Sequence, residues 1–253
     1  MNLGRVYLLI LTLALGACET SPEKKENPAE ERAKIAALNT QLAVAYMRDN
    51  ENELALKKLA KALDADPKYV DAHDTYALLY SRLGNVQKAE QSYKDALRID
   101  PINPSALNNY GQFLCQQKRY DEGQAKFLEA IKNPLYRSPE NALTNAGLCA
   151  LQAKNLEVAE QHFRNALQID AELAPALYSM AQLSYDKANY LQARGYHQRF
   201  VQVAPQTARS LWLGIRIEHA LHDKDAESSY SLVLKNKFPD APETGFLQQG
   251  KFD

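Results

Sequence analysis

The sequence predicts an all-α protein made of stacked helical hairpins, because a short segment and a long period both recur along the chain. The segment ALRIDP at 96–101 has close relatives at 62–67 and 166–171. The period is 34 residues, which is the separation of Pro67 from Pro101. Self-similarity at a period of this size is typical of repeat architectures in which each unit is one supersecondary structure.

The pattern within each period resembles the tetratricopeptide repeat, a helix-turn-helix unit of this length. The eighth position of a unit is glycine or alanine, which lets its two helices approach closely, and the second helix follows the pattern A-x3-F-x2-A. The aspartate-proline pair ends the second helix, because proline disfavours helical geometry in the residue before it. One hairpin cannot bury its own apolar face, so the units are expected to share one superhelical core.

Six units are expected, and together they fill residues 35–240. Their predicted bounds are 36–69, 70–103, 104–139, 140–173, 174–206 and 207–240. Repeat three has Gly123 where alanine is expected, and we expect this glycine to loosen its second helix by up to about 1 kcal/mol. Repeat four follows a connection lengthened by two residues and ends in Ala171 instead of proline, while repeat five has His197 at the large-aromatic position.

The last unit differs from the others. Its segment 208–221 holds Trp212, the single tryptophan, and apolar residues on more than one face of the helix. A terminal unit of a stack should turn a polar face outward. Either the C-terminal tail, 241–253, covers this unit or a partner protein does.

Residues 1–17 predict a lipoprotein signal peptide. An apolar run from Val6 to Leu15, preceded by an arginine, is too short to cross a bilayer as a helix and matches a secretory signal. It ends in LGAC, which resembles the bacterial lipobox, in which the cysteine sulfur receives a diacylglycerol. We therefore expect the mature chain to begin at Cys18 with covalent acyl lipid as its membrane anchor. The alternative is a plain signal peptide with a coincidental cysteine.

The residues after the anchor predict a tether and a location. Residues 18–34 are rich in charge and proline and low in large apolar side chains, which favours a flexible segment. Aspartate directly after the lipidated cysteine usually holds such proteins at the inner membrane. Because Glu19 stands there, we expect an outer-membrane protein that faces the periplasm.

Composition and motifs argue against several function classes. Lysine plus arginine number 30 against 31 aspartate plus glutamate, so the charge does not indicate a nucleic-acid partner. The sequence has no G-x-S-x-G, P-loop, H-E-x-x-H or G-x-G-x-x-G motif, so we predict no catalysis, no cofactor and no small-molecule substrate. His219 and His222 are three residues apart, but no second pair lies at ligand spacing, and no metal is predicted.

Two internal cysteines are candidates for a disulfide. Cys115 and Cys149 lie in the first helices of neighbouring units, 34 residues apart. An exported protein in an oxidising compartment favours pairing, which contributes about 3 to 4 kcal/mol in the chain-entropy model. Because the sequence does not fix the distance between the sulfurs, two unpaired core thiols are the alternative.

First helices line the concave surface of a superhelix of this kind, so their inward positions predict a binding groove. These positions are Thr40, Val44, Met47, Asp74, Leu78, Ser81, Asn108, Gln112, Thr144, Leu148, Leu151, Tyr178, Gln182, Tyr185, Leu211 and Ile215. A mixed apolar and amide-rich groove suits an extended or helical peptide. The alternative at each position is packing against an adjacent helix.

Three stretches resemble the PilF/PilW family of type IV pilus biogenesis and stability lipoproteins. They are LNNYGQFLCQQKRYDEG, NPLY and ARSLWLGIRIEHALHDKDAESSYSLVLKNKFPD. The resemblance implies a pilotin, an outer-membrane lipoprotein that binds the pilus secretin or another pilus-assembly protein and promotes its localisation and multimer assembly. A general periplasmic scaffold for other envelope-assembly proteins is the alternative.

Overall fold

The structure is a computed structural model that describes residues 27–252. Within this range the chain forms thirteen helices and no strand, which confirms the all-α prediction. The predicted signal peptide, Cys18 and the tether up to residue 26 lie outside the described residues. No helix in the described range is long and apolar enough to span a membrane.

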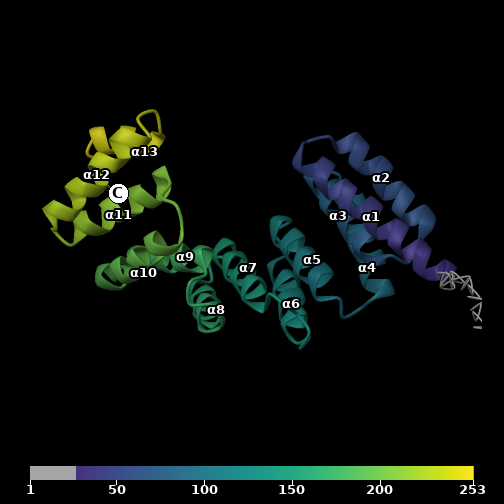
Figure 1. The fold of residues 1–253 in the computed structure, drawn as a ribbon. Helices are drawn as coiled ribbons and strands as arrows, with labels where there is room; N and C mark the ends of the chain where they lie inside the picture. The colour runs from purple at the N-terminus through teal and green to yellow at the C-terminus, as the bar shows by residue number, and fades with distance from the viewer. Residues whose placement is uncertain (1–26, 253) are drawn as a thin grey trace, which may run out of the picture.

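Twelve helices form six consecutive pairs that are arranged in an open arch (Figure 1). The first helices of the pairs are α1 (Pro28–Arg48), α3 (Val70–Arg82), α5 (Pro104–Gln116), α7 (Pro139–Gln152), α9 (Ala174–Asp186) and α11 (Ala208–Ala220). The second helices are α2 (Asn52–Ala65), α4 (Val86–Ile99), α6 (Tyr120–Ile131), α8 (Leu156–Ile169), α10 (Tyr190–Val203) and α12 (Lys224–Lys237). A short helix, α13 (Pro242–Gln248), follows the last pair.

The arch curves because its two layers of helices are spaced differently. Each first helix packs against the next first helix, from α1 with α3 to α9 with α11. In residues 27–252 no second helix packs against another second helix. The first helices therefore form the tight inner layer, and their inward side chains face the hollow of the arch.

The core pairs small residues of one helix with aromatic residues of its partner. Tyr93, Phe127 and Phe163 of the second helices are at most 1% exposed. A methyl group built on Gly111 of α5 would lie 2.9 Å from the ring of Phe127, closer than side-chain carbons pack. The small eighth position thus gives the ring its space, as the repeat pattern predicts.

A residue with a left-handed backbone ends each first helix. These residues are Asn50, Gly84, Lys118, Lys154, Ala188 and His222, with φ between 58° and 74°. They repeat the 34-residue register, except where the lengthened connection before repeat four separates Lys118 from Lys154 by 36. The turn between the two helices is thus the same in every unit, although only one has the glycine that adopts this conformation without strain.

The first helix begins earlier than the sequence analysis predicted. Residues 28–34, assigned to the flexible tether, are the first turns of α1. The side chain of Asn27 accepts a hydrogen bond from the backbone N–H of Ala29 (3.1 Å), Pro28 occupies the first turn, and two glutamates follow it. These are helix-starting signals, so the tether prediction is wrong for this segment.

A disulfide joins repeats three and four. Cys115 of α5 and Cys149 of α7 are bonded, with their Cα atoms 5.6 Å apart, and both are buried. A methyl group on Gly123 of α6 would overlap the Cys115 sulfur and lie 2.9 Å from the carbonyl oxygen of Gly111. Glycine is therefore required at position 123, because it makes room for the disulfide. The expected weakening of α6 by this glycine stays a prediction.

The C-terminal tail covers the last unit. Trp212 is 9% exposed, and its ring stacks on Phe252, with 5.7 Å between centroids, and contacts Phe246. Arg216 donates from Nε to the carbonyl oxygen of Phe252 (3.1 Å). We call residues 242–252 the C-terminal cap. The apolar face of α11 is therefore covered by the C-terminal tail, which was one of the two predicted alternatives, and not left open for a partner protein.

Candidate protein-binding surface

The predicted groove residues separate into open and buried sets. The half-buried or exposed ones are Val44, Met47, Leu78, Ser81, Asn108, Gln112, Leu148, Leu151, Tyr178, Gln182 and Tyr185. They lie on five successive first helices, from α1 to α9. Five of them also pack against buried core residues, namely Met47, Leu78, Leu151, Tyr178 and Tyr185. Only the exposed part of each side chain is open to a ligand.

Leu211 and Ile215 do not line a groove. Both are 0% exposed and pack with Trp212 and Leu234 under the C-terminal cap. The prediction is wrong for this pair, because it treated α11 as an open inner helix.

Two predicted threonines are also mostly buried. Thr144 is 4% exposed, and its hydroxyl donates to the carbonyl oxygen of Glu140 (2.8 Å), so its predicted place in the groove is wrong. Thr40 is 6% exposed and donates to Ala36 in the same way (2.8 Å), yet it still borders a cavity. A threonine facing a neighbouring helix satisfies its hydroxyl within its own helix.

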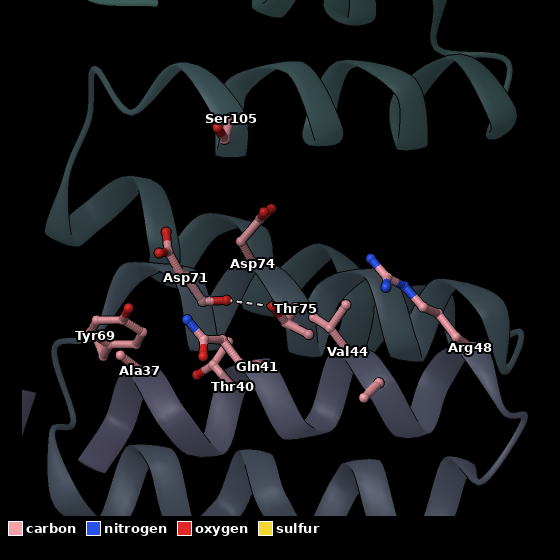
Figure 2. A pocket seen from close by; sticks show the side chains of 11 residues that line it. Ala37, Thr40, Gln41, Val44, Arg48, Tyr69, Asp71, Asp74, Thr75 and Ser105 are labelled. Atoms are coloured by element: carbon pink, nitrogen blue, oxygen red, sulfur yellow. Dashed lines mark hydrogen bonds between the residues drawn. The ribbon is translucent and has the colours of Figure 1, made fainter. Parts of the chain in front are cut away.

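The N-terminal half of the inner face holds a cavity of about 540 Å³ between α1, α3 and α5 (Figure 2). Its wall is formed by Ala37, Thr40, Gln41, Val44, Ala45, Arg48, Tyr69, Asp71, Asp74, Thr75 and Ser105. The wall combines apolar carbons, amide and hydroxyl groups and three charges. Such a surface has groups for both the side chains and the backbone of a peptide.

A second cavity of about 230 Å³ lies between α3 and α5. It is lined by Leu78, Ser81, Arg82, Tyr93, Asn109, Gln112, Phe113 and Gln116. Asn109, which lines this cavity, donates from Nδ2 to Asp74 Oδ2, on the wall of the first, at 2.8 Å. A hydrogen bond between α3 and α5 therefore connects the walls of the two cavities.

The bond between Asn109 and Asp74 begins a chain of side-chain hydrogen bonds that joins three units. Asn108 donates weakly to Asn109 Oδ1 (3.4 Å), and Asn145 of α7 donates to Asn108 Oδ1 (3.0 Å). Asp74 and Asn108 are among the predicted groove residues, whereas Asn109 and Asn145 are not. The sequence contains a pattern that could have identified them, because both are asparagines at the sixth position of consecutive units.

Asp74 has a carboxyl pKa far above the ordinary value for aspartate. Burial, together with the negative charge of Asp71, raises the pKa of its carboxyl to about 7, against the lowering effect of the Asn109 hydrogen bond. Its Oδ1 is buried without a hydrogen-bond partner. The carboxyl group thus changes charge near neutral pH.

Comparison with known proteins agrees with this geometry. A model of the tetratricopeptide repeat family matches residues 40–104, 75–134 and 114–174. Over 99% of this chain and all of the relative, the sequence is 34% identical to the type IV pilus assembly protein PilF of Pseudomonas aeruginosa. A solved structure of that PilF matches with a TM-score of 0.78 and 35% identity, covering 87% of this chain and 100% of the other. A crystal structure of PilW, described as a widely conserved type IV pilus biogenesis factor, matches with a TM-score of 0.77 and 30% identity. The match covers 85% of this chain and 98% of the PilW chain.

The chain belongs to the PilF/PilW family. The resemblance seen in the three sequence stretches is confirmed, and so is the tetratricopeptide-repeat superhelix.

In this PilF/PilW-family protein the two halves of the inner face differ in chemistry. The half formed by α1, α3 and α5 has the cavities of about 540 Å³ and 230 Å³, and Arg48, Asp71 and Asp74 lie on the wall of the first. In the other half the ring of Tyr178 contacts Phe200, with 5.5 Å between centroids, and the guanidinium of Arg216 lies 4.3 Å from the ring centre of Tyr185. The polar half is therefore the better candidate for binding a peptide backbone.

His219, in α11, and His222, which follows α11, both have positions explained by packing or by the turn. His219 stacks on Phe252, with 3.9 Å between centroids, and its Nδ1 lies 3.3 Å from Glu227 Oε2. His222 is the left-handed residue that ends the helix. Among residues 27–252 no group of three histidine, cysteine, aspartate or glutamate side chains has the arrangement of a metal site.

Proposed function

We propose that this protein acts in type IV pilus biogenesis as a pilotin, which binds the pilus secretin and promotes its outer-membrane localisation and multimer assembly or stabilises the pilus machine. The observation that carries the proposal is the match, over 99% of the chain, to a type IV pilus assembly protein. The cavities between the first helices support binding of another polypeptide. No catalytic residue is part of the proposal.

The proposed anchor is acyl lipid on Cys18. Nine residues, 19–27, separate this cysteine from the start of α1. Even a fully extended chain of that length spans only about 30 Å. The anchored arch would therefore work close to the periplasmic surface of the outer membrane, where a secretin inserts.

Deletion of the gene tests the proposal. Secretin multimers in the outer membrane and surface pili should both decrease, and expression of the intact protein should restore them. Undiminished multimers and pili in the deletion strain would reject the role in pilus assembly.

Two variants separate lipidation from location. Cys18→Ala should leave the protein in the soluble periplasmic fraction with reduced secretin assembly. Glu19→Asp keeps the cysteine and should move the lipidated protein to the inner membrane. If secretin multimers form normally with Cys18→Ala, the anchor has no part in the function.

Purification of the lipidated protein from solubilised envelopes tests the partner. Secretin subunits should copurify in the wild-type strain. Recovery of cell-wall enzymes without secretin would instead favour a general periplasmic scaffold.

A further inference from the structure

The cavity between α1, α3 and α5 contains a carboxylate that no group of the described chain neutralises. Asp74 is 9% exposed, and one of its oxygens, Oδ2, accepts from Asn109. The other oxygen, Oδ1, is buried and has no hydrogen-bond partner. Because buried polar atoms are normally paired, this oxygen indicates a place where a donor from another molecule would be accepted.

A second carboxylate faces the same cavity. Asp71 precedes Asp74 by three residues, so both project from one face of α3. Figure 2 shows the two carboxylates directed toward the helix that holds Ser105, while Arg48 approaches from α1 at the other end of the view. In the part of the chain that the structure describes, Arg48 makes no ion pair or hydrogen bond. Two carboxylates thus share a cavity with one distant guanidinium.

We infer that this cavity binds a basic side chain, lysine or arginine, of a partner polypeptide, with Asp71 and Asp74 as the acceptors. A donor that is also a cation fits both the unpaired oxygen and the repulsion between the two carboxylates. The inference rests on the proposed function in that the basic residue belongs to the pilus-assembly partner.

A polypeptide fits the site better than an isolated cation. The cavity of about 540 Å³ is larger than one lysine or arginine side chain requires. Gln41 stands on its wall, and Gln112 stands on the wall of the second cavity. Side-chain amides can donate to and accept from a peptide backbone, so these residues would hold the chain on either side of the basic residue.

Binding requires a small rearrangement of Asp74. Its Oδ1 is covered by neighbouring side chains, so the carboxylate must turn toward the cavity to meet the cation. The hydrogen bond with Asn109 can persist, because a carboxylate accepts several donors through its two oxygens.

The charges around Asp74 predict how binding depends on pH. Asp71 on α3 raises the pKa of Asp74, and Arg48 is the only cation among the residues that line the cavity. Tyr93 of α4 and Tyr69 before α3 have pKa values raised by burial and by aspartates, so both stay neutral. Asp74 is therefore the group that titrates near pH 7, and the ionised form that accepts a cation predominates above it.

The test uses the purified protein and two probe peptides that differ in one side chain. One probe is acetyl-Ala-Arg-Ala-Ala-amide, and in the other citrulline, which is neutral and of the same shape, replaces arginine. Binding is followed by chemical-shift changes of backbone amides. We expect the arginine probe to bind about tenfold more tightly and to shift the signals of α1 and α3. Its affinity should rise by about tenfold from pH 6 to pH 8, as the Asp74 carboxyl ionises.

Asp74→Asn is the decisive variant, since asparagine preserves shape and can still accept from Asn109. It should lose the preference for arginine and the pH dependence. Asp64→Asn on α2, which removes an aspartate that does not line the cavity, should keep both. Equal affinity for the two probes, or an unchanged preference in Asp74→Asn, would overturn the inference. Those results leave the proposed function intact, whereas undiminished secretin multimers after gene deletion reject the proposed function whatever the probes do.

Discussion

The disulfide between Cys115 and Cys149 gives the most quantitative prediction. It closes a loop with a sequence separation of 34 residues. In the chain-entropy model such a cross-link stabilises the folded state by about 4 kcal/mol. For a protein of this size 1 kcal/mol shifts the melting temperature by about 2–4 °C, so reduction should lower it by about 10 °C. Thermal unfolding followed by circular dichroism, with and without reductant, measures this difference.

A variant separates the cross-link from the packing of the sulfur atoms. Cys115→Ala combined with Cys149→Ala should melt slightly below the reduced wild type, because it also loses two buried sulfurs, and reductant should have no effect on it. If reductant leaves the melting temperature of the wild type unchanged, the reasoning about loop closure is refuted.

Four other changes test separate contacts. Gly123→Ala should destabilise the oxidised protein by about 1–3 kcal/mol in urea unfolding, because its methyl group overlaps the disulfide; a stabilised variant would contradict this. Ala188→Gly should stabilise by roughly 0.5–1 kcal/mol, since alanine is strained at φ 58°, and no gain would argue against strain there. Truncation before Pro242 should shift Trp212 fluorescence to longer wavelength, because the cap is removed; unchanged emission would show that the cap does not cover the ring. Asp74 binds a proton up to about pH 7 when folded but only below about pH 4 when unfolded, so wild-type stability falls as pH rises through this window. Asp74→Asn should lack this loss, which reaches on the order of 4 kcal/mol; parallel pH profiles would refute the assignment.

The sequence by itself determined the repeat architecture. The contacts that build a unit join residues within one hairpin or in adjacent hairpins, so they recur every 34 residues and appear as a pattern. Gly111 against Phe127 is one such contact. The sequence also indicated the PilF/PilW family, because the longer stretches in repeats three and six are more specific to that family than the repeat pattern itself.

Only the tertiary structure decided which positions are open. Leu211 and Ile215 have the same register as open residues in other units, yet the C-terminal cap buries them. The repeat pattern favours alanine at position 123, but the Cys115 sulfur occupies the space that an alanine methyl group would need. In each case the deciding neighbour lies outside the hairpin or outside the repeat pattern. A periodic pattern records contacts shared by all units, whereas exposure depends on the particular side chains and segments that pack on each one.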